Sequence, residues 1–483
     1  MVGFHGPARR EGIVELGTEV FLMDLLELHV NRWAEQQFGS CQLGDKRRTQ
    51  RAVVAAVQFA ADPSGSTTRQ TESWGECKAV YRLMDREEVT FRALAEPHWK
   101  RTRAQTRGHY LLLGDTTTLD FGAHRDVEGL APVGDGRGRG FLLHSSLMVS
   151  AEGEEIVGLA GQTIYHRKPV PKGETFRQRL NRERESKIWG EVIELAGPAP
   201  EHVRFTHVFD RGADNFEVYC RLMQSQTDWV VRVAQLRRRV ITPTGERGRL
   251  DHSLQSLPVS GTYELSVGAN KDQPARTAQM EVRFGIVLVP APRDCGKFVR
   301  ECGITTIAMW VVEVREVKPP AGMKPLHWAL FTSHAVESFD DAWRIIGYYE
   351  KRPLIEEFHK ALKTGCRLES RQYRKSHRLE ALTGMISVLA VRLLQLKSIA
   401  RADPDRPAKQ VVPKRWLRMA QCLQRGKHRK LSTVREFYHA VARLGGWLGR
   451  KHDGQPGWIT LWRGFDKLIL MIRGAEASMS KCG

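Results

Sequence analysis

Two short apolar runs that each lead to an aspartate place the strongest constraint on how this chain folds. The first run, Tyr110–Leu113, continues into Gly114 and Asp115, and the second, Phe205–Phe209, continues directly into Asp210. Apolar runs of this length, followed by small or polar residues, are typical of buried strands in an α/β sheet. We therefore predict that each aspartate lies just past the end of its strand, where the ligand sites of such sheets open.

The sequence pattern changes at several points along the chain. Apolar residues at helical spacing dominate before residue 109 and after residue 374, and Asp45 is an expected helix N-cap. Between these regions, short apolar runs alternate with helical segments, including a charged helix expected at Arg179–Leu195 and a flexible glycine-rich loop at Gly134–Gly140. We predict an N-terminal extension at 1–29 with Met23 as an alternative start, a helical domain at 30–108, an α/β domain at 109–374 with a β-rich insertion at about 234–325, and a helical domain at 375–483.

The charge balance indicates a polyanionic partner. Lys and Arg number 75 against 55 acidic residues, which gives a net charge of +20 and a pI near 9.8. Nucleic acid is the usual partner of so basic a chain. No apolar run approaches the roughly 18 residues needed to span a bilayer, so we expect no membrane association. The eight cysteines are scattered without a CxxC pair, and the N-terminus lacks the layout of a signal peptide, so we expect a cytoplasmic protein.

A second unusual feature is the charged stretch from Tyr349 to Lys363. On a single helix its polar residues fall along one stripe, and Leu354, Ile355, Phe358 and Leu362 fall on the opposite side. A solvated helix face is the ordinary explanation of such a stripe. The stripe contains one phenol, one carboxylate and three cations: Tyr349, Arg352, Glu356, Lys360 and Lys363.

Three carboxylates that converge from distant parts of the chain could support phosphoryl transfer. Asp115 and Asp210 at strand ends, joined by Glu356 from a helix, could bind a pair of Mg²⁺ ions. Two such ions, about 3.5–4 Å apart, can activate a water or hydroxyl and stabilise the leaving oxygen. Spacing alone is weak support, because the chain has 55 acidic residues from which three could be chosen.

The order of several short motifs gives this hypothesis stronger support. The chain resembles the cut-and-paste DNA transposases of the DDE superfamily and is similar to the bacterial family that includes the transposon-five transposase. The resemblance runs from about Trp33 to near Gly464 and includes a Tyr-x2-Arg-x3-Glu-x6-Lys signature at Tyr349, Arg352, Glu356 and Lys363. The other matching segments are Leu43–Thr49, Asp115–Thr117, His144–Ser145, Asp210–Asp214, Ile355–Lys360, Val391–Leu396 and Ala442–Gly446.

The resemblance implies a catalytic core with an RNase H-like fold, interrupted by the β-rich insertion. It implies Asp115, Asp210 and Glu356 as the catalytic triad and as the ligands of two Mg²⁺ ions, for which Mn²⁺ could substitute. It also implies nicking, attack by the freed 3′-OH to form a DNA hairpin, hairpin opening and strand transfer. Trp328 matches the aromatic residue that stacks on the base flipped out near the transposon end.

The same resemblance implies the partners of the chain. These are transposon-end DNA, target DNA and a second copy of the chain in a homodimeric synaptic complex, within a bacterial cytoplasm at the nucleoid. Two departures stand out: Pro353 replaces a larger residue, and Ala400–Leu431 follows the family poorly. Pro353 would be harmless in the first turn of a helix starting near Arg352, and would kink the stripe elsewhere. The implied DNA contacts are Arg48, Arg51, Arg232, Trp328, Tyr349, Arg352, Lys360 and Lys363.

Two alternatives remain open on the sequence. A catalytically lapsed transposase that only binds DNA would have the same basic composition, although all three acids are present. A nuclease of the RNase H type would nick DNA without forming hairpins or joined products.

Overall fold

A computed structural model describes most of the chain: residues 30–122, 127–153, 155–182, 184–268, 274–424, 431–450 and 453–479. The predicted extension at 1–29, with Met23, lies outside these residues. The described chain forms two compact units. We call residues 106–115 and 169–353 the core unit, and residues 30–105, 116–168 and 354–479 the terminal unit. The four-domain division expected from the sequence stays a prediction.

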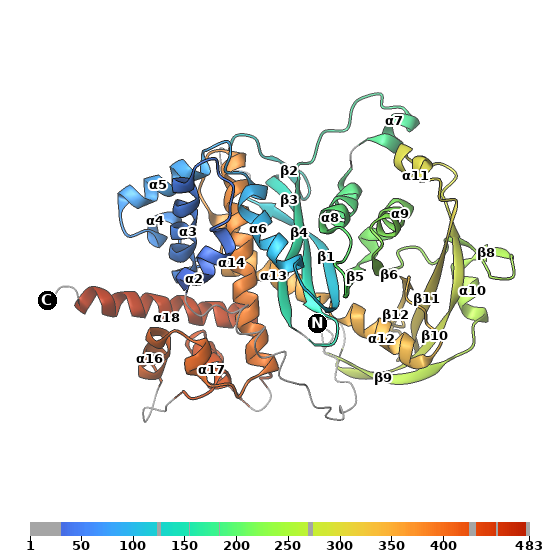
Figure 1. Cartoon of the computed structure of the whole chain (residues 1–483). Helices are drawn as coiled ribbons and strands as arrows, with labels where there is room; N and C mark the ends of the chain where they lie inside the picture. Colours follow the sequence, from blue (N-terminus) through green and yellow to red (C-terminus); the bar gives the residue numbers. More distant parts are fainter. Residues whose placement is uncertain are drawn as a thin grey trace. The chain divides into compact units, whose positions relative to one another are not determined.

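The core unit contains a mixed sheet. Strand β1 (Gly108–Asp120), of which the first part belongs to this unit, pairs in parallel with β5 (Val203–Phe209), and β5 pairs in parallel with β6 (Asp228–Arg232). Strand β12 (His327–Thr332) then adds to β6 in the antiparallel direction. Helices α8 (Ile188–Ala196) and α9 (Phe216–Gln224) lie side by side in this unit (Figure 1). The predicted α/β class is therefore confirmed.

The β-rich segment predicted at about 234–325 extends this sheet. Antiparallel pairs join β12 to β11, β11 to β10, and β10 to both β9 and β7, while β7 pairs with β8. Apolar residues of β10 are buried at alternating positions, as expected for a strand with one covered face, whereas β11 also buries the continuous run 311–314. The strand bounds are β7 Arg239–Ile241, β8 Arg247–Arg249, β9 Gly261–Val267, β10 Arg276–Pro290 and β11 Thr306–Val317, with helices α10 Leu250–Ser256 and α11 Lys297–Cys302 between them.

The charged helix expected at Arg179–Leu195 is wrong as a single element. The chain forms α7 (Phe176–Asn181), a 3₁₀ turn at Glu185–Lys187 and then α8. Residues 181–187 include no apolar side chain, so a continuous helix would have no face to bury there. Burial begins only at Ile188, where α8 starts.

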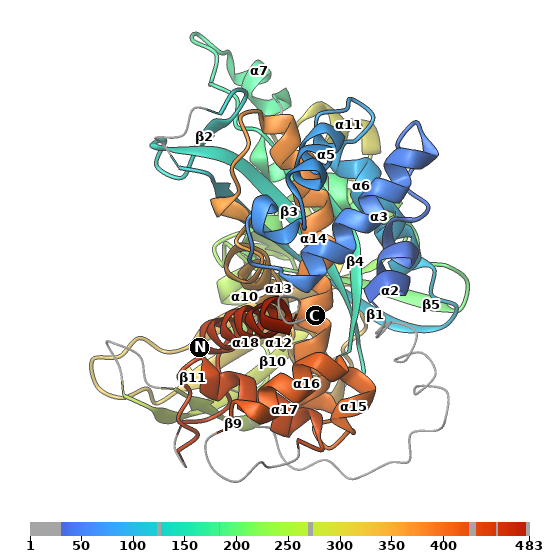
Figure 2. The same cartoon turned by 90° about the vertical axis from the view of Figure 1, so that its left-hand side faces the viewer.

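The terminal unit begins with helices that pack against the long helix α14 (Ser376–Ala402), as Figures 1 and 2 show. Asp45 caps α3, with its carboxylate 2.6 Å from the backbone nitrogen of Arg47, as the sequence predicted. The first helices of the unit are α2 Val30–Phe38, α3 Lys46–Ala61, α4 Thr67–Gln70, α5 Trp74–Met84 and α6 Phe91–Arg103.

Three further strands belong to the terminal unit: β2 (Ala131–Val133), β3 (Gly138–Ser150) and β4 (Ile156–Tyr165). Both pairs, β2 with β3 and β3 with β4, are antiparallel. Of the glycine-rich segment expected to be a flexible loop, residues 134–137 form the turn of the β2–β3 hairpin and residues 138–140 begin strand β3. Gly134 and Gly136 adopt positive φ angles of 61° and 92°, which suit glycine in a tight turn.

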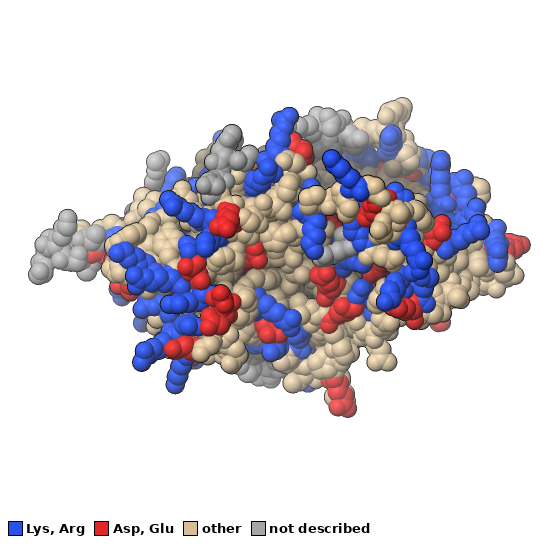
Figure 3. Space-filling view, turned by 90° about the horizontal axis from the view of Figure 1, so that it is seen from above, with Lys and Arg blue, Asp and Glu red and all other residues tan. Residues whose placement is uncertain are grey.

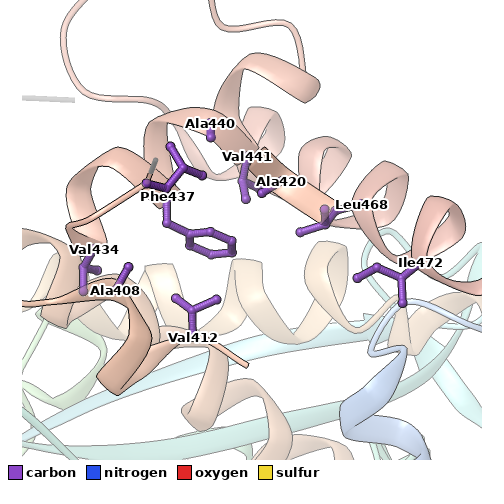
Figure 4. Close-up of a cluster of buried hydrophobic side chains, with 10 residues drawn as sticks. Ala408, Val412, Ala420, Val434, Phe437, Ala440, Val441, Leu468 and Ile472 are labelled. Atoms are coloured by element: carbon purple, nitrogen blue, oxygen red, sulfur yellow. The ribbon is translucent and has the colours of Figure 1, made fainter. Parts of the chain in front are cut away.

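The C-terminal part of the terminal unit is helical, as predicted. Helices α16 (Lys414–Cys422), α17 (Val434–Leu444) and α18 (Trp458–Met479) surround a separate apolar core, and α15 (Ala408–Val411) precedes them. Phe437 is central in this core (Figure 4). None of the described helices is both long enough and apolar enough to cross a membrane. The basic segment 425–430 lies outside the described residues.

Candidate active site and nucleic-acid interface

Asp115 and Asp210 occupy equivalent positions on neighbouring parallel strands. The β1–β5 register pairs Gly108 with Val203 and Leu113 with Val208, so two further residues bring Asp115 level with Asp210. Gly114 allows the close approach, because a Cβ atom there would lie 2.3 Å from the ring of Phe209. Asp210 follows the last residue of β5, as predicted.

The expected strand end before Asp115 is wrong. Strand β1 continues through Asp115 to Asp120, although its pairing with β5 ends at Leu113. Strand β3 is the other neighbour of β1, and the backbone nitrogen of Phe121 donates to the carbonyl of Arg139 at 2.9 Å. This second neighbour keeps the residues after Asp115 extended. Asp115 therefore lies where β1 leaves β5, within a strand.

One guanidinium bridges the two carboxylates. Arg352 Nη2 lies 3.1 Å from Asp115 Oδ1 and 3.2 Å from Asp210 Oδ2. The side chains of Arg352, Asp115 and Asp210 are 13%, 17% and 34% exposed, so this cluster is largely shielded from water. Asp210 Oδ1 also accepts a 2.7 Å hydrogen bond from the backbone nitrogen of Gly212, which fixes the carboxylate. The two carboxylates thus converge on one cationic group.

The chain breaks its helix next to Arg352, so the charged stripe predicted from Tyr349 to Lys363 does not lie on one helix. Helix α12 (Phe339–Glu350) ends before Lys351, and α13 (Pro353–Lys360) starts at Pro353. Pro353 has no N–H to donate to the carbonyl of Tyr349, and the backbone nitrogen of Arg352 donates there instead, at 3.0 Å. Pro353 occupies the first helical position, which confirms the condition under which it was expected to be harmless.

The second half of the stripe belongs to the terminal unit. Glu356 is exposed in the first turn of α13, and Lys360 is exposed at its last residue, whereas Ile355 and Phe358 are fully buried. Lys363 lies in a π-helical turn, η3 (Ala361–Gly365). The polar and apolar sides of α13 are therefore those predicted from the sequence.

Arg232, Trp328 and Tyr349 come together in the core unit. Arg232 lies directly opposite Leu330 in the β6–β12 pair, and Trp328 is two residues from Leu330, so Arg232 and Trp328 share one face of the sheet. The guanidinium carbon of Arg232 lies 6.0 Å from the centre of the Tyr349 ring. Trp328 is half-buried at the start of β12, which leaves part of the ring accessible.

The two arginines predicted to contact DNA in the N-terminal region lie on α3. Arg48 forms a 2.8 Å ion pair with Glu88 and donates to the carbonyl of Leu43 at 3.0 Å. Arg51 follows one turn later and is half-buried. They share one side of α3, as their spacing predicted.

Sequence reasoning missed two interactions beside the site. The first is the contact of Arg352 with both Asp115 and Asp210. The spacing of the signature does not show which side chain lies between the two aspartates. The other is Asp214, whose buried carboxylate forms a 2.7 Å ion pair with Arg238 and accepts hydrogen bonds from Tyr219 and the backbone of Ala234. The family-matching segment Asp210–Asp214 contains this aspartate, and the three arginines of the Leu236–Val240 run are a signal for its partner.

The surface of the protein is basic without being uniform. Lys and Arg side chains are spread over the face in Figure 3, with acidic side chains between them. Within the described residues, no group of three or more His, Cys, Asp or Glu side chains has the geometry of a metal site. What the structure does show is the pair of carboxylates held by Arg352.

Comparisons with known protein families identify both ends of the chain. The family described as "Transposase DNA-binding" matches residues 30–89, which contain Arg48 and Arg51. The family described as "Transposase Tn5 dimerisation domain" matches residues 388–483, which contain the apolar core of α16–α18. The chain is thus a DNA transposase, an enzyme class that cleaves and joins DNA. The two matches, which together cover less than half of the chain, support a Tn5-like transposase, with one region for binding DNA and another for forming a homodimer.

Proposed function

We propose that this transposase excises and inserts its element by metal-dependent phosphoryl transfer at Asp115, Asp210 and Glu356, within an RNase H-like core. The observation that carries the proposal is the convergence of Asp115 and Asp210 on one guanidinium nitrogen, at 3.1 and 3.2 Å. These aspartates are far apart in the sequence and level in the β1–β5 register. Glu356 follows Arg352 by four residues, and α13 presents it on the exposed side of the helix.

The carboxylate pair fits a divalent cation. Its oxygen atoms already accommodate a positive group, the Arg352 guanidinium, and carboxylate oxygens are the ligands that Mg²⁺ prefers. Asp115, Asp210 and Glu356 would hold two Mg²⁺ ions, and Mn²⁺ could replace them. When bound, such ions activate the attacking oxygen and stabilise the leaving oxygen. Arg352, released from the carboxylates, is then available to bind a DNA phosphate.

The other side chains of the site would hold DNA. The DNA backbone of the transposon end would contact Arg232, Tyr349, Lys360 and Lys363. Arg48 and Arg51 would contact the same end at a greater distance from the cleavage site. Trp328 would stack on a base flipped out of the duplex, which is needed for hairpin formation. Its half-buried position on the same face as Arg232 supports this role. The reaction would proceed in a synaptic homodimer, with capture of target DNA at the bacterial nucleoid.

The test is cleavage of a donor DNA that carries the terminal repeats flanking the gene, with Mg²⁺. Wild type should produce nicks, then hairpins, then joined products. Asp210→Ala should produce none of these while still binding the donor. Asp340→Ala is the matched control, because Asp340 is an exposed acid at the start of α12 in the same unit.

The outcomes separate the competing functions. Equal cleavage by wild type and Asp210→Ala would remove the triad assignment. Nicks without hairpins would indicate a nuclease of the RNase H type. Specific binding with no cleavage by the wild type would indicate a lapsed transposase that serves as a DNA-binding protein.

A further inference from the structure

A basic cavity lies within the terminal unit, next to Lys363. Its volume is about 540 Å³, and residues of the 363–370 segment and of helix α18 line it. Three cations line it: Lys363 and Arg367 on one wall and Arg463 on the other. Arg367 and Arg463 match no position in the signature that contains Lys363.

The acidic side chains of the cavity are engaged elsewhere. Glu369 Oε1 lies 3.0 Å from Lys363 Nζ and accepts a 3.0 Å hydrogen bond from the backbone nitrogen of Asp120. Asp466 accepts a hydrogen bond from the hydroxyl of Ser64. In the described part of the chain, neither Arg367 nor Arg463 has an ion-pair or hydrogen-bond partner for its guanidinium, and both residues are exposed. Two cations therefore face the cavity without an ion pair of their own, and the carboxylates of Glu369 and Asp466 complete its polar lining.

The backbone at Arg367 is held in a conformation that an arginine rarely adopts. Its φ and ψ angles are 48° and 44°, in the left-handed region that favours glycine. A side chain at such a position costs free energy and gives no packing in return here, because Arg367 is exposed. A glycine at this position would relieve the strain, so it separates the contribution of the Arg367 side chain from its effect on folding.

The opposite wall is fixed against this segment. A Cβ atom at Gly365 would lie 2.5 Å from the ring of Trp462, so the backbone of η3 packs directly on α18. Lys363 Nζ also donates to the carbonyl of Thr118 at 2.9 Å. Beside Arg463, Ile459 leaves 59% of its surface exposed, which adds an apolar area to the basic wall. The cavity thus has walls that contact each other at Gly365 and Trp462, two available guanidinium groups and one exposed apolar side chain.

We propose that this cavity is a site for the DNA backbone, in which Arg367 and Arg463 bind phosphates and Ile459 contacts deoxyribose. This inference rests on the proposed function, because it extends the DNA path from Lys363. A sugar–phosphate chain matches the site: guanidinium groups pair with phosphate oxygens, and the apolar sugar covers Ile459. Arg463 would also give helix α18 of the dimerisation region a direct contact with DNA.

The sharpest test is Arg367→Gly in the full-length protein. This substitution should not lower the melting temperature, but it should lower the affinity for DNA. Glycine adopts the left-handed conformation without strain, so the variant should melt no lower than wild type. Its affinity for a duplex carrying the terminal repeat should fall about tenfold in EDTA. The slope of log affinity against log salt should become shallower by about one for each phosphate that the variant no longer binds.

Arg463→Ala should weaken binding in the same way, and Arg418→Ala is its matched control. Arg418 is an exposed arginine on α16 that does not line the cavity, so binding should not change. Wild-type affinity and salt slope in both Arg367→Gly and Arg463→Ala would overturn the inference. If the wild type itself neither binds nor cleaves the repeat, the proposed function fails. If it does both while these variants match it, only the inference fails.

Discussion

At the scale of single residues, Arg352 neutralises two carboxylates that come from distant parts of the sequence. In the free protein its guanidinium lies within 3.2 Å of both aspartates and offsets their mutual repulsion. In the proposed metal-bound site, a divalent cation at the same carboxylates would make this neutralisation unnecessary. The sequence indicated that Arg352 belongs with Glu356 and Lys363, but only the fold shows that it also contacts Asp115 and Asp210. A side chain that joins three distant segments leaves no trace in local spacing.

Arg352→Gln should therefore lower stability and increase the response to Mg²⁺. Without the guanidinium, two largely shielded carboxylates face each other, which should cost about 2 kcal/mol in the free energy of unfolding. Mg²⁺ should restore part of this loss, so it should raise the melting temperature of the variant more than that of wild type. Thermal melts with MgCl₂ and with EDTA measure both effects, and Arg344→Gln on α12 is the control. An equal Mg²⁺ response in wild type and variant would contradict this role for Arg352.

At the scale of helices and strands, composition and spacing predicted most elements but not their junctions. Strand β5 and helix α3 lie where the apolar run Phe205–Phe209 and the N-cap residue Asp45 placed them. The break between α12 and α13 occurs at Pro353, which lacks a backbone N–H. The sequence showed the proline, but it did not show that the proline would occupy the first turn of a new helix. The continuation of β1 past Asp115 depends on β3, a neighbour that a strand-by-strand prediction does not include.

Gly114→Ala tests the close contact of β1 and β5 that sets the two aspartates level. The added methyl group would lie 2.3 Å from the Phe209 ring, so the strands must separate or the ring must move. Overpacking of this kind should cost about 1–3 kcal/mol in the free energy of unfolding. Phe209→Leu combined with Gly114→Ala should recover part of that loss, as urea denaturation would show. Strictly additive effects of the two substitutions would contradict a direct contact.

At the scale of the whole molecule, the two matched families lie at the ends of the chain and the proposed chemistry lies between them. The basic composition predicted a nucleic-acid partner before any fold was known, since a net charge of +20 favours binding to a polyanion. The helical ends and the mixed sheet also followed from apolar periodicity. The placement of Asp115 against Asp210 did not, because strand order and register depend on long-range pairing that periodicity does not encode.

The stability of the molecule should depend on pH through its buried histidines. Burial lowers the pKa of both His98 and His207 to about 3, well below the value near 6.5 of an unfolded chain. The unfolded chain then binds more protons as the pH falls below about 6.5, so stability is full above that pH and declines below it. Each histidine should remove about 1.4 kcal/mol per pH unit across this range.

His207→Leu isolates one of these contributions. Neither ring nitrogen of His207 has a hydrogen-bond partner among the described residues, so leucine should cost little stability at pH 7. Between pH 6.5 and 5 the variant should lose about 2 kcal/mol less than wild type. Urea denaturation at the two pH values measures the difference, and the same loss in both proteins would show that His207 is not buried in its neutral form.

The central claim is that Asp115, Asp210 and Glu356 bind a divalent cation, and iron-directed cleavage of the protein tests it most directly. Fe²⁺ bound in place of Mg²⁺, with ascorbate and peroxide, generates hydroxyl radicals that cut the backbone close to the metal. We predict cuts near residues 115, 210 and 356 that excess Mg²⁺ suppresses and that Asp210→Ala abolishes. Cuts elsewhere in the chain, or cuts at these positions that persist in Asp210→Ala, would contradict the account.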